Sequence, residues 1–155
     1  VNNKWGFNMQ TPKHLYNRGE LYNLSITKGT LNVEERYKIN EHMIQGIIML
    51  ESLKFPKMLS NVVEIAGGHH EKMDGTGFPK RLRREDMSVS ARMMAIADIF
   101  EALTAADRPY KKAKKLSEAI KIMSFMKKDN HIDGPLFDLF LKSGIYLEYA
   151  IQHPV

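Results

Sequence analysis

The chain has 155 residues, of which 43% are apolar and 26% are charged, and its formal net charge is +5. These proportions are typical of one folded domain and exclude a disordered chain. Because cysteine is absent, disulfides and thiolate metal sites are excluded, and a bound metal would need histidine, carboxylate or water ligands.

The first part of the chain, residues 1–28, is a lead-in segment whose structure the pattern does not predict. It lacks the basic-then-apolar order of a secretory signal, and no apolar run in the chain approaches the roughly 18 residues of a membrane span. We therefore expect a cytoplasmic protein without a membrane span. The first residue is valine rather than methionine, and we expect the chain to be a piece of a longer polypeptide.

The first predicted helix spans residues 32–52. Asn32 and Glu35 have the spacing of a capping box, which marks the start of a helix. An apolar stripe at helical spacing follows, formed by Ile39, Met43, Gly46 and Leu50. His42 borders this stripe.

Two adjacent histidines, His69 and His70, follow a second predicted helix that starts near Pro56 and stops at Gly67 and Gly68. Successive side chains on a regular helix lie about 100° apart, so neighbours cannot point the same way. A helix end relaxes that limit, and both rings can then converge on one point. Neutral imidazole is a good ligand for divalent transition metals.

Residues 71–87 are turn formers and charges, which predicts a loop long enough to be functional.

A third helix is predicted from Ser88 to Ala105, and Asp98 interrupts an alanine stripe on one of its faces. The stripe consists of Ala91, Ala95, Ala102 and Ala105. A carboxylate facing a packed stripe is desolvated at high cost unless a cation or donors compensate it. The alternative is an exposed helix face.

The remaining residues predict an all-α ending. Ser117 is expected to cap a fourth helix, and residues 135–142 and 145–151 predict short final helices. Because no stretch alternates as a half-buried strand does, the expected fold class is all-α. The basic runs have few aromatic residues between them, so no nucleic acid partner is expected.

A single histidine is more often structural than a ligand, but these residues form a set. His42, His69, His70 and Asp98 are four ligand-type residues on three predicted helices or their ends. The other histidines show no partner pattern, and we expect them at the surface or in packing; they are His14, His131 and His153.

The run from His69 to Pro79 resembles the HHE-xx-DGxGYP stretch of the HD-GYP family, the bacterial phosphodiesterases that hydrolyse cyclic di-GMP. Residues 29–42 resemble the family segment that brings a histidine ligand. Residues 97–104 and 107–111 resemble its late aspartate helix and its basic turn. The resemblance covers roughly residues 20–145, and it implies an HD-superfamily-like helical bundle that is incomplete at its N-terminal side.

Residues 29–155 would then be the C-terminal part of the domain. The resemblance implies that His42, His69 and His70 bind one metal ion and that Asp98 binds its neighbour. Two ions, iron or manganese, would fill the complete site. The implied substrate-binding residues are Asp74, Gly75, Gly77, Phe78 and Pro79 at the rim of the pocket, with Arg108 and Lys111 on substrate phosphate.

The chain departs from the family pattern in three places. Phe78 replaces the family's tyrosine and removes a hydroxyl. The stretch from Asp98 to Arg108 is one residue longer, which leaves the direction of Arg108 open. No His-Asp dipeptide occurs, and the corresponding positions hold Lys13 and His14. Either the pair lies further upstream in a longer polypeptide, or the chain is a degenerate relative; the intact downstream ligands favour the first explanation.

The resemblance implies a metal-dependent phosphodiesterase for cyclic di-GMP in the intact protein, in which this chain supplies part of the active site. The cyclic dinucleotide and upstream domains of the same polypeptide are the expected partners, and a homodimer is a further option. The isolated chain should be poorly active. A non-catalytic signalling module that binds cyclic di-GMP or a partner protein, and a phosphohydrolase for another nucleotide, stay open.

Overall fold

The computed structural model describes residues 3–27, 29–105 and 114–152. In these ranges the regular elements are helices, and strand-like pairing is limited to an isolated bridge between Asp74 and Arg83. The predicted all-α class is therefore confirmed. Among the described residues, no helix has both the length and the apolar character needed to cross a membrane.

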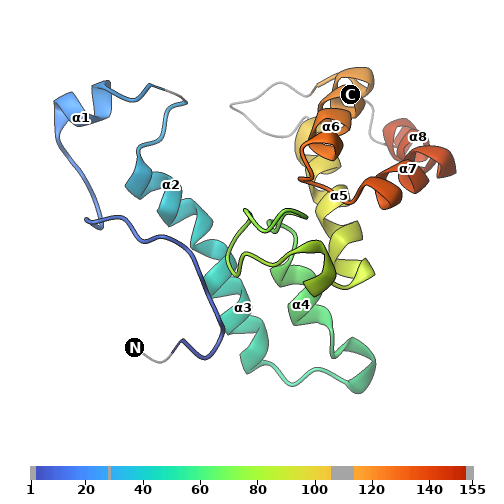
Figure 1. The fold of residues 1–155 in the computed structure, drawn as a ribbon, viewed down its shortest axis with the longest axis horizontal. Coiled ribbons are helices and arrows are strands. Elements are labelled where there is room, and N and C mark those ends of the chain that lie inside the picture. The colour runs from blue at the N-terminus through green and yellow to red at the C-terminus, as the bar shows by residue number, and fades with distance from the viewer. Residues whose placement is uncertain (1–2, 28, 106–113, 153–155) are drawn as a thin grey trace.

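Among the described residues, the longest connection between helices contains the loop of residues 71–87, between α4 and α5 (Figure 1). The helices are α1 (Glu20–Leu24), α2 (Val33–Asn40), α3 (His42–Ser52), α4 (Val62–Gly67), α5 (Val89–Thr104), α6 (Leu116–Lys128), α7 (Gly134–Ser143) and α8 (Ile145–Gln152), with 3₁₀ turns η1 (Lys57–Leu59) and η2 (Arg84–Asp86). Helix α3 packs on α4 and α4 on α5, while α6 and α7 pack on the far part of α5. The 71–87 loop lies near the middle of the view, in front of α4.

The predicted helix of residues 32–52 is divided in the structure. Its capping box is present, because the Asn32 side chain accepts from the Glu35 N–H at 2.8 Å and the Glu35 carboxylate accepts from the Asn32 N–H at 2.9 Å. The helix is interrupted at Glu41, so that His42 becomes the first residue of α3. The apolar stripe is only partly buried, because Met43 is 3% exposed but Ile39 is 54% exposed.

The second predicted helix begins later than expected. Pro56 precedes η1, and α4 begins only at Val62, although it ends at Gly67 as predicted. A Cβ atom at Gly67 would lie 2.9 Å from Ile47, so glycine at this position allows α3 and α4 to approach closely. This contact brings the start of α3 near the end of α4.

The ends of the later helices test the predicted bounds and the predicted Ser117 cap. Helix α5 lies within one residue of its predicted bounds, and Ser88 caps it by accepting from the Ala91 N–H at 3.2 Å. The Ser117 cap is wrong, because α6 already begins at Leu116 and has no side-chain cap. Helix α7 is capped by Asp133, which accepts from the Leu136 N–H at 3.1 Å.

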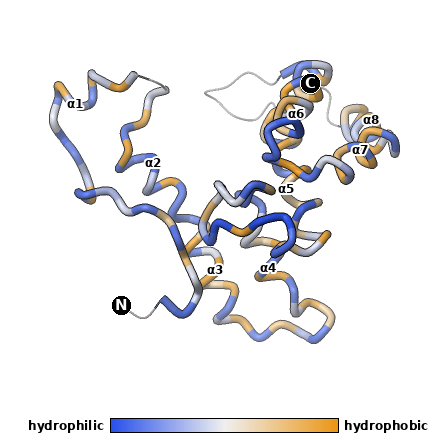
Figure 2. The backbone as a smooth tube through the Cα atoms, in the orientation of Figure 1, coloured by the Kyte–Doolittle hydropathy of each residue, from blue (hydrophilic) through white to orange (hydrophobic). Residues whose placement is uncertain are grey.

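The main apolar core lies between α5, α6 and α7. Its buried members are Ile96, Phe100, Leu103, Ala119, Met123, Ile132 and Phe137. A smaller cluster of Met73, Met87 and Ala91 lies beneath the 71–87 loop. Much of that loop carries hydrophilic colours in Figure 2, whereas hydrophilic and hydrophobic segments alternate along α5 to α7. The loop is therefore attached through few apolar side chains.

Hydrogen bonds join the lead-in segment to α2, to α3 and to the 71–87 loop; near α2, the Tyr22 hydroxyl donates to Glu34 and the Asn32 amide donates to Asn23. The Trp5 indole N–H donates to the Glu51 carboxylate on α3. The Asn8 N–H donates to the Pro79 carbonyl in the 71–87 loop at 2.7 Å. The proposed division of the chain at residues 28 and 29 stays a prediction.

Candidate metal centre

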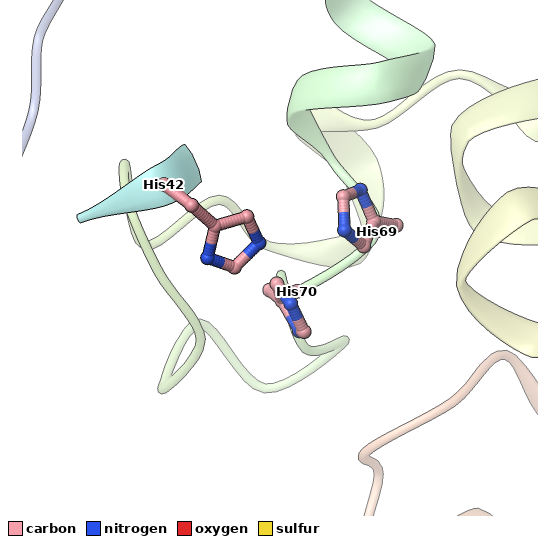
Figure 3. A group of neighbouring side chains, drawn as sticks. All are labelled: His42, His69 and His70. Atoms are coloured by element: carbon pink, nitrogen blue, oxygen red, sulfur yellow. The ribbon is translucent and has the colours of Figure 1, made fainter. Parts of the chain in front are cut away.

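The structure brings His42, His69 and His70 together, and each offers a ligand atom within 4.8 Å of the others. Figure 3 shows the three rings facing a common space. His42 comes from the start of α3, and the adjacent pair comes from the turn that follows α4. The ring centroids of His69 and His70 are 4.4 Å apart, so the helix end lets neighbouring residues point the same way.

Backbone carbonyls orient two of the three rings. His42 Nδ1 lies 2.6 Å from the Ile39 carbonyl oxygen, and His69 Nδ1 lies 2.7 Å from the Ala66 carbonyl oxygen. A carbonyl can only accept, so each Nδ1 carries the proton and donates. The lone pair then remains on Nε2, as in histidine ligands whose other nitrogen is held by a carbonyl.

The surroundings of His70 lower the pKa of its imidazole. The pKa of His70 is lowered to about 4, mainly by burial and also by the neighbouring His69 and His42, while the Asp98 charge opposes the shift. The imidazole is therefore neutral at neutral pH and keeps a lone pair for a metal ion. One face of the ring stacks on Phe78, with a centroid distance of 4.9 Å and an interplanar angle of 20°.

Asp98 lies on α5, outside the group that the three histidines form. Its charge acts on His70, as the effect on the pKa of His70 shows. Ala91 and Ala95 are each 1% exposed, so that part of the alanine stripe is packed as expected, but Asp98 itself is half-buried. The exposure of the Asp98 side chain therefore lies between the two alternatives that the sequence left open, a buried carboxylate and an exposed helix face. The ligand role of Asp98 stays a prediction.

The predicted rim residues of the 71–87 loop have two kinds of position. Asp74 is exposed, and its Oδ1 accepts from the Thr76 N–H at 2.9 Å and the Thr76 hydroxyl at 2.8 Å; these bonds lower the pKa of Asp74. Gly77 and Pro79 are buried, so they shape the loop instead of presenting side chains. Phe78 is half-buried against His70. Contact of these residues with substrate stays a prediction.

The two glycines of the loop are required by geometry. Gly75 has φ of +80°, a left-handed conformation that side chains disfavour. A Cβ atom at Gly77 would lie 2.4 Å from the Lys72 nitrogen, so any other residue would collide with the backbone. The loop can therefore fold back on the segment that carries His70.

Glu71 organises the loop, a role that the sequence analysis missed. Its carboxylate is in a residue only 2% exposed, and it accepts from the Lys80 N–H at 2.7 Å and the Leu82 N–H at 2.9 Å. Burial raises the pKa of Glu71, and these backbone hydrogen bonds oppose the increase. An acidic residue directly before a long loop rich in unpaired N–H groups is the signal that could have indicated this role.

Asp133 is a second organising carboxylate that the sequence analysis missed. Besides capping α7, it pairs with Arg84 Nε of η2 at 2.8 Å and with Arg92 of α5. Burial would raise the pKa of Asp133, but the Leu136 N–H and the two arginines more than offset it, and the pKa is lowered. The sequence signal is Asp133 before Gly134 and a proline, which is typical of a helix start.

Several residues of the sequence analysis are not placed at the site. Arg108 and Lys111 lie outside the described residues, as does His153. His14 is exposed, and His131 is half-buried beside the loop, where its carbonyl accepts from the Met73 N–H at 3.3 Å. The expectation that Arg108 and Lys111 contact phosphate stays a prediction.

Comparison with known proteins gives a consistent result. A family model described as an HD domain matches residues 1–136. A cyclic di-GMP phosphodiesterase of Pseudomonas aeruginosa is 39% identical over 119 residues, which cover 76% of this chain and 28% of that protein. A 3'3'-cGAMP-specific phosphodiesterase of Vibrio cholerae is 32% identical over 148 residues, which cover 90% of this chain and 33% of that protein. A cyclic di-GMP phosphodiesterase of Thermotoga maritima is 37% identical over 93 residues, which cover 60% of this chain and 25% of that protein.

Proposed function

Because this chain belongs to the HD domain family, we propose that it supplies part of the active site of a metal-dependent phosphodiesterase that hydrolyses cyclic di-GMP. The observation that carries the proposal is the convergence of His42, His69 and His70, whose ligand atoms lie within 4.8 Å of one another. The chain spans only 28–33% of the first two relatives described above. In this proposal, upstream domains of the same polypeptide would supply the remaining part of the active site.

The histidine donor set fits a divalent metal ion. With bonds of about 2.1 Å, ligand atoms of one ion lie roughly 3.0–4.2 Å apart, so small ring rotations would complete the site. His42 and His69 have Nε2 free to bind, and His70 is uncharged. Iron or manganese suits such a site, with Asp98 binding a neighbouring ion. When bound, two such ions supply a hydroxide at neutral pH and neutralise charge on the phosphate oxygens.

The protein's own groups would position the substrate. The 71–87 loop lies beside the histidines and presents Asp74 and Phe78 at its surface, which suits a rim that excludes water from one side of the phosphate. Arg108 and Lys111 would donate to the phosphate oxygens, because charge-assisted hydrogen bonds to phosphate are strong. A cytoplasmic location is part of the same proposal.

A second candidate substrate is 3'3'-cGAMP, because one of the relatives is named for that specificity. Both molecules are cyclic dinucleotides with the same pair of phosphodiester bonds, and they differ in one base. The metal site can act on either, so the choice between them depends on groups that contact the bases. Turnover of the two compounds by the intact protein, measured at equal concentration, distinguishes these candidates.

The experiment that tests the proposed function compares the intact protein with this 155-residue chain, with iron or manganese supplied to both. We expect the intact protein to hydrolyse cyclic di-GMP and the isolated chain to do so poorly, because a single ion cannot stabilise both the attacking and the leaving oxygen. Robust turnover by the isolated chain would contradict the assignment of ligands. Binding without turnover by both would support a signalling module, and turnover of an unrelated nucleotide would support a different phosphohydrolase.

A further inference from the structure

His70 differs from the other two histidines in what holds its ring. The rings of His42 and His69 are fixed by Nδ1 hydrogen bonds to carbonyl oxygens. Within the described residues, no hydrogen bond reaches the ring of His70. A ligand ring without such a bond can rotate about its side-chain torsions, and rotation would turn its lone pair away from the other two nitrogens.

The ring of Phe78 takes the place of that hydrogen bond. It lies nearly parallel to the His70 imidazole, with 4.9 Å between centroids and 20° between planes. Stacked rings in this range attract one another and resist tilting, because tilting opens a gap on one side of the stack. The contact therefore restricts the plane of the imidazole, which also contains the lone pairs of its nitrogens.

Phe78 is itself held at a fixed distance from His70 by the backbone. The Phe78 N–H donates to the His70 carbonyl at 3.3 Å. The preceding Gly77 lies so close to the Glu71 and Lys72 backbone that a Cβ atom would be 2.4 Å from the Lys72 nitrogen. On the other side of Phe78, the Glu71 carboxylate holds the Lys80 N–H. Both rings thus belong to one hydrogen-bonded loop, which runs from His70 to Lys80.

We propose that Phe78 is a positioning residue for the metal centre, whose ring fixes the plane of the His70 imidazole so that its lone pair points at the ion shared with His42 and His69. This inference rests on the proposed metal site. It requires an aromatic face at position 78 but no hydroxyl group. The tyrosine of the HD-GYP pattern and the phenylalanine of this chain would therefore serve equally well.

The test is a cobalt titration of the protein and its variants, followed by the visible absorption of bound Co²⁺, which reports the ligands and their geometry. Phe78→Leu removes the ring and keeps an apolar side chain, whereas Phe78→Tyr keeps the ring. We expect Phe78→Leu to bind Co²⁺ about tenfold more weakly, with a shifted absorption band, as for other residues that orient metal ligands. Phe78→Tyr should match the unsubstituted protein in both respects.

Two controls separate positioning from stability. Phe55→Leu makes the same substitution at a half-buried residue in the connection between α3 and η1, and it should leave affinity and spectrum unchanged. Thermal unfolding without metal shows whether each variant folds, and Phe78→Met replaces Phe78→Leu if the leucine variant does not.

The outcomes for the metal site and for Phe78 are distinct. If His70→Ala loses Co²⁺ binding while Phe78→Leu keeps the affinity and spectrum of the unsubstituted protein, the role of Phe78 is overturned and the metal site stands. If His70→Ala binds Co²⁺ as the unsubstituted protein does, the metal site itself is wrong. A Phe78→Tyr variant as weak as Phe78→Leu would also overturn the role of the ring.

Discussion

Two regions of the molecule are held together by different interactions. The α5–α7 core is a cluster of buried apolar side chains, including Met123 and Phe137, which are at most 1% exposed. Residues 69–87 are held by backbone hydrogen bonds and by hydrogen bonds to two buried carboxylates, Glu71 and Asp133, above a small apolar cluster. Apolar burial is non-directional, whereas hydrogen bonds fix distance and angle. We therefore expect core substitutions to change stability, and loop substitutions to change the geometry of the site.

The largest expected effect is the loss of stability on truncating the core at Phe137. Phe137→Ala should lower the free energy of unfolding by about 3–5 kcal/mol, because the removed ring leaves a cavity. Chemical denaturation measures this change. Leu139→Ala, at a residue of the same helix that is 60% exposed, should change stability by no more than about 0.5 kcal/mol. Equal losses in the two variants would contradict the position of the core.

The Asp133 carboxylate joins three elements, so its removal should affect both regions. Asp133→Asn weakens the pairs with Arg84 and Arg92 and should cost about 2 kcal/mol, in the range of charge-assisted hydrogen bonds. Arg84 is 53% exposed, so most of the loss should come from Arg92, which is 13% exposed. Denaturation of Asp133→Asn, Arg84→Gln and Arg92→Gln checks this order. A larger loss for Arg84→Gln would contradict it.

The pH dependence of stability gives an independent test of the same carboxylate. Its pKa is lowered in the folded state, so its contribution is complete above the unfolded pKa of about 3.9. The contribution is lost as the pH falls through the folded pKa. Acid unfolding of Asp133→Asn should consequently show a weaker dependence on pH below about pH 4 than the unsubstituted protein. An unchanged dependence would mean that Asp133 is not charged in the folded state.

Glu71→Gln should cost less stability but should disturb the loop. The amide can accept from only one of the two N–H groups now held by the carboxylate, so we expect a loss of about 1–2 kcal/mol. The Lys80 and Leu82 amides should exchange hydrogen faster in Glu71→Gln than in the unsubstituted protein, and exchange in α6 serves as the reference. Exchange that is unchanged at both amides would show that the carboxylate does not hold the loop.

The smallest expected effect lies at the start of α2, away from both regions. Asn32→Ala removes the cap and half of the capping box and should lower stability by about 1 kcal/mol. Because the cap lies at the opposite end of α2 from Ile39, whose carbonyl holds His42 Nδ1, metal affinity should stay unchanged. Thermal unfolding and a metal titration of the same variant check both statements, and a loss of metal affinity would show that the cap also affects the Ile39 carbonyl that holds His42.

Local signals allowed part of this structure to be predicted from the sequence. The Asn32 capping box involves residues within one helical turn, and it is present. The helix end at Gly67 was also predictable, and with it the position of the adjacent histidines in a turn.

Long-range pairing explains what could not be predicted. Asp133 meets Arg92 and Arg84 across 41 and 49 residues of sequence, and nothing local marks these partners. The exposure of Ile39 depends on which face of α2 has a neighbour, which periodicity alone does not determine. The Phe78 stack on His70 depends on the path of the whole loop.

The X-ray absorption spectrum of the protein loaded with one equivalent of Zn²⁺ tests the three-histidine site most directly. We expect three imidazole nitrogens at about 2.0–2.1 Å from the metal, with two remaining in His42→Ala. A first shell of oxygen atoms without imidazole scattering, or the same spectrum for His42→Ala and the unsubstituted protein, would contradict a metal ion shared by His42, His69 and His70.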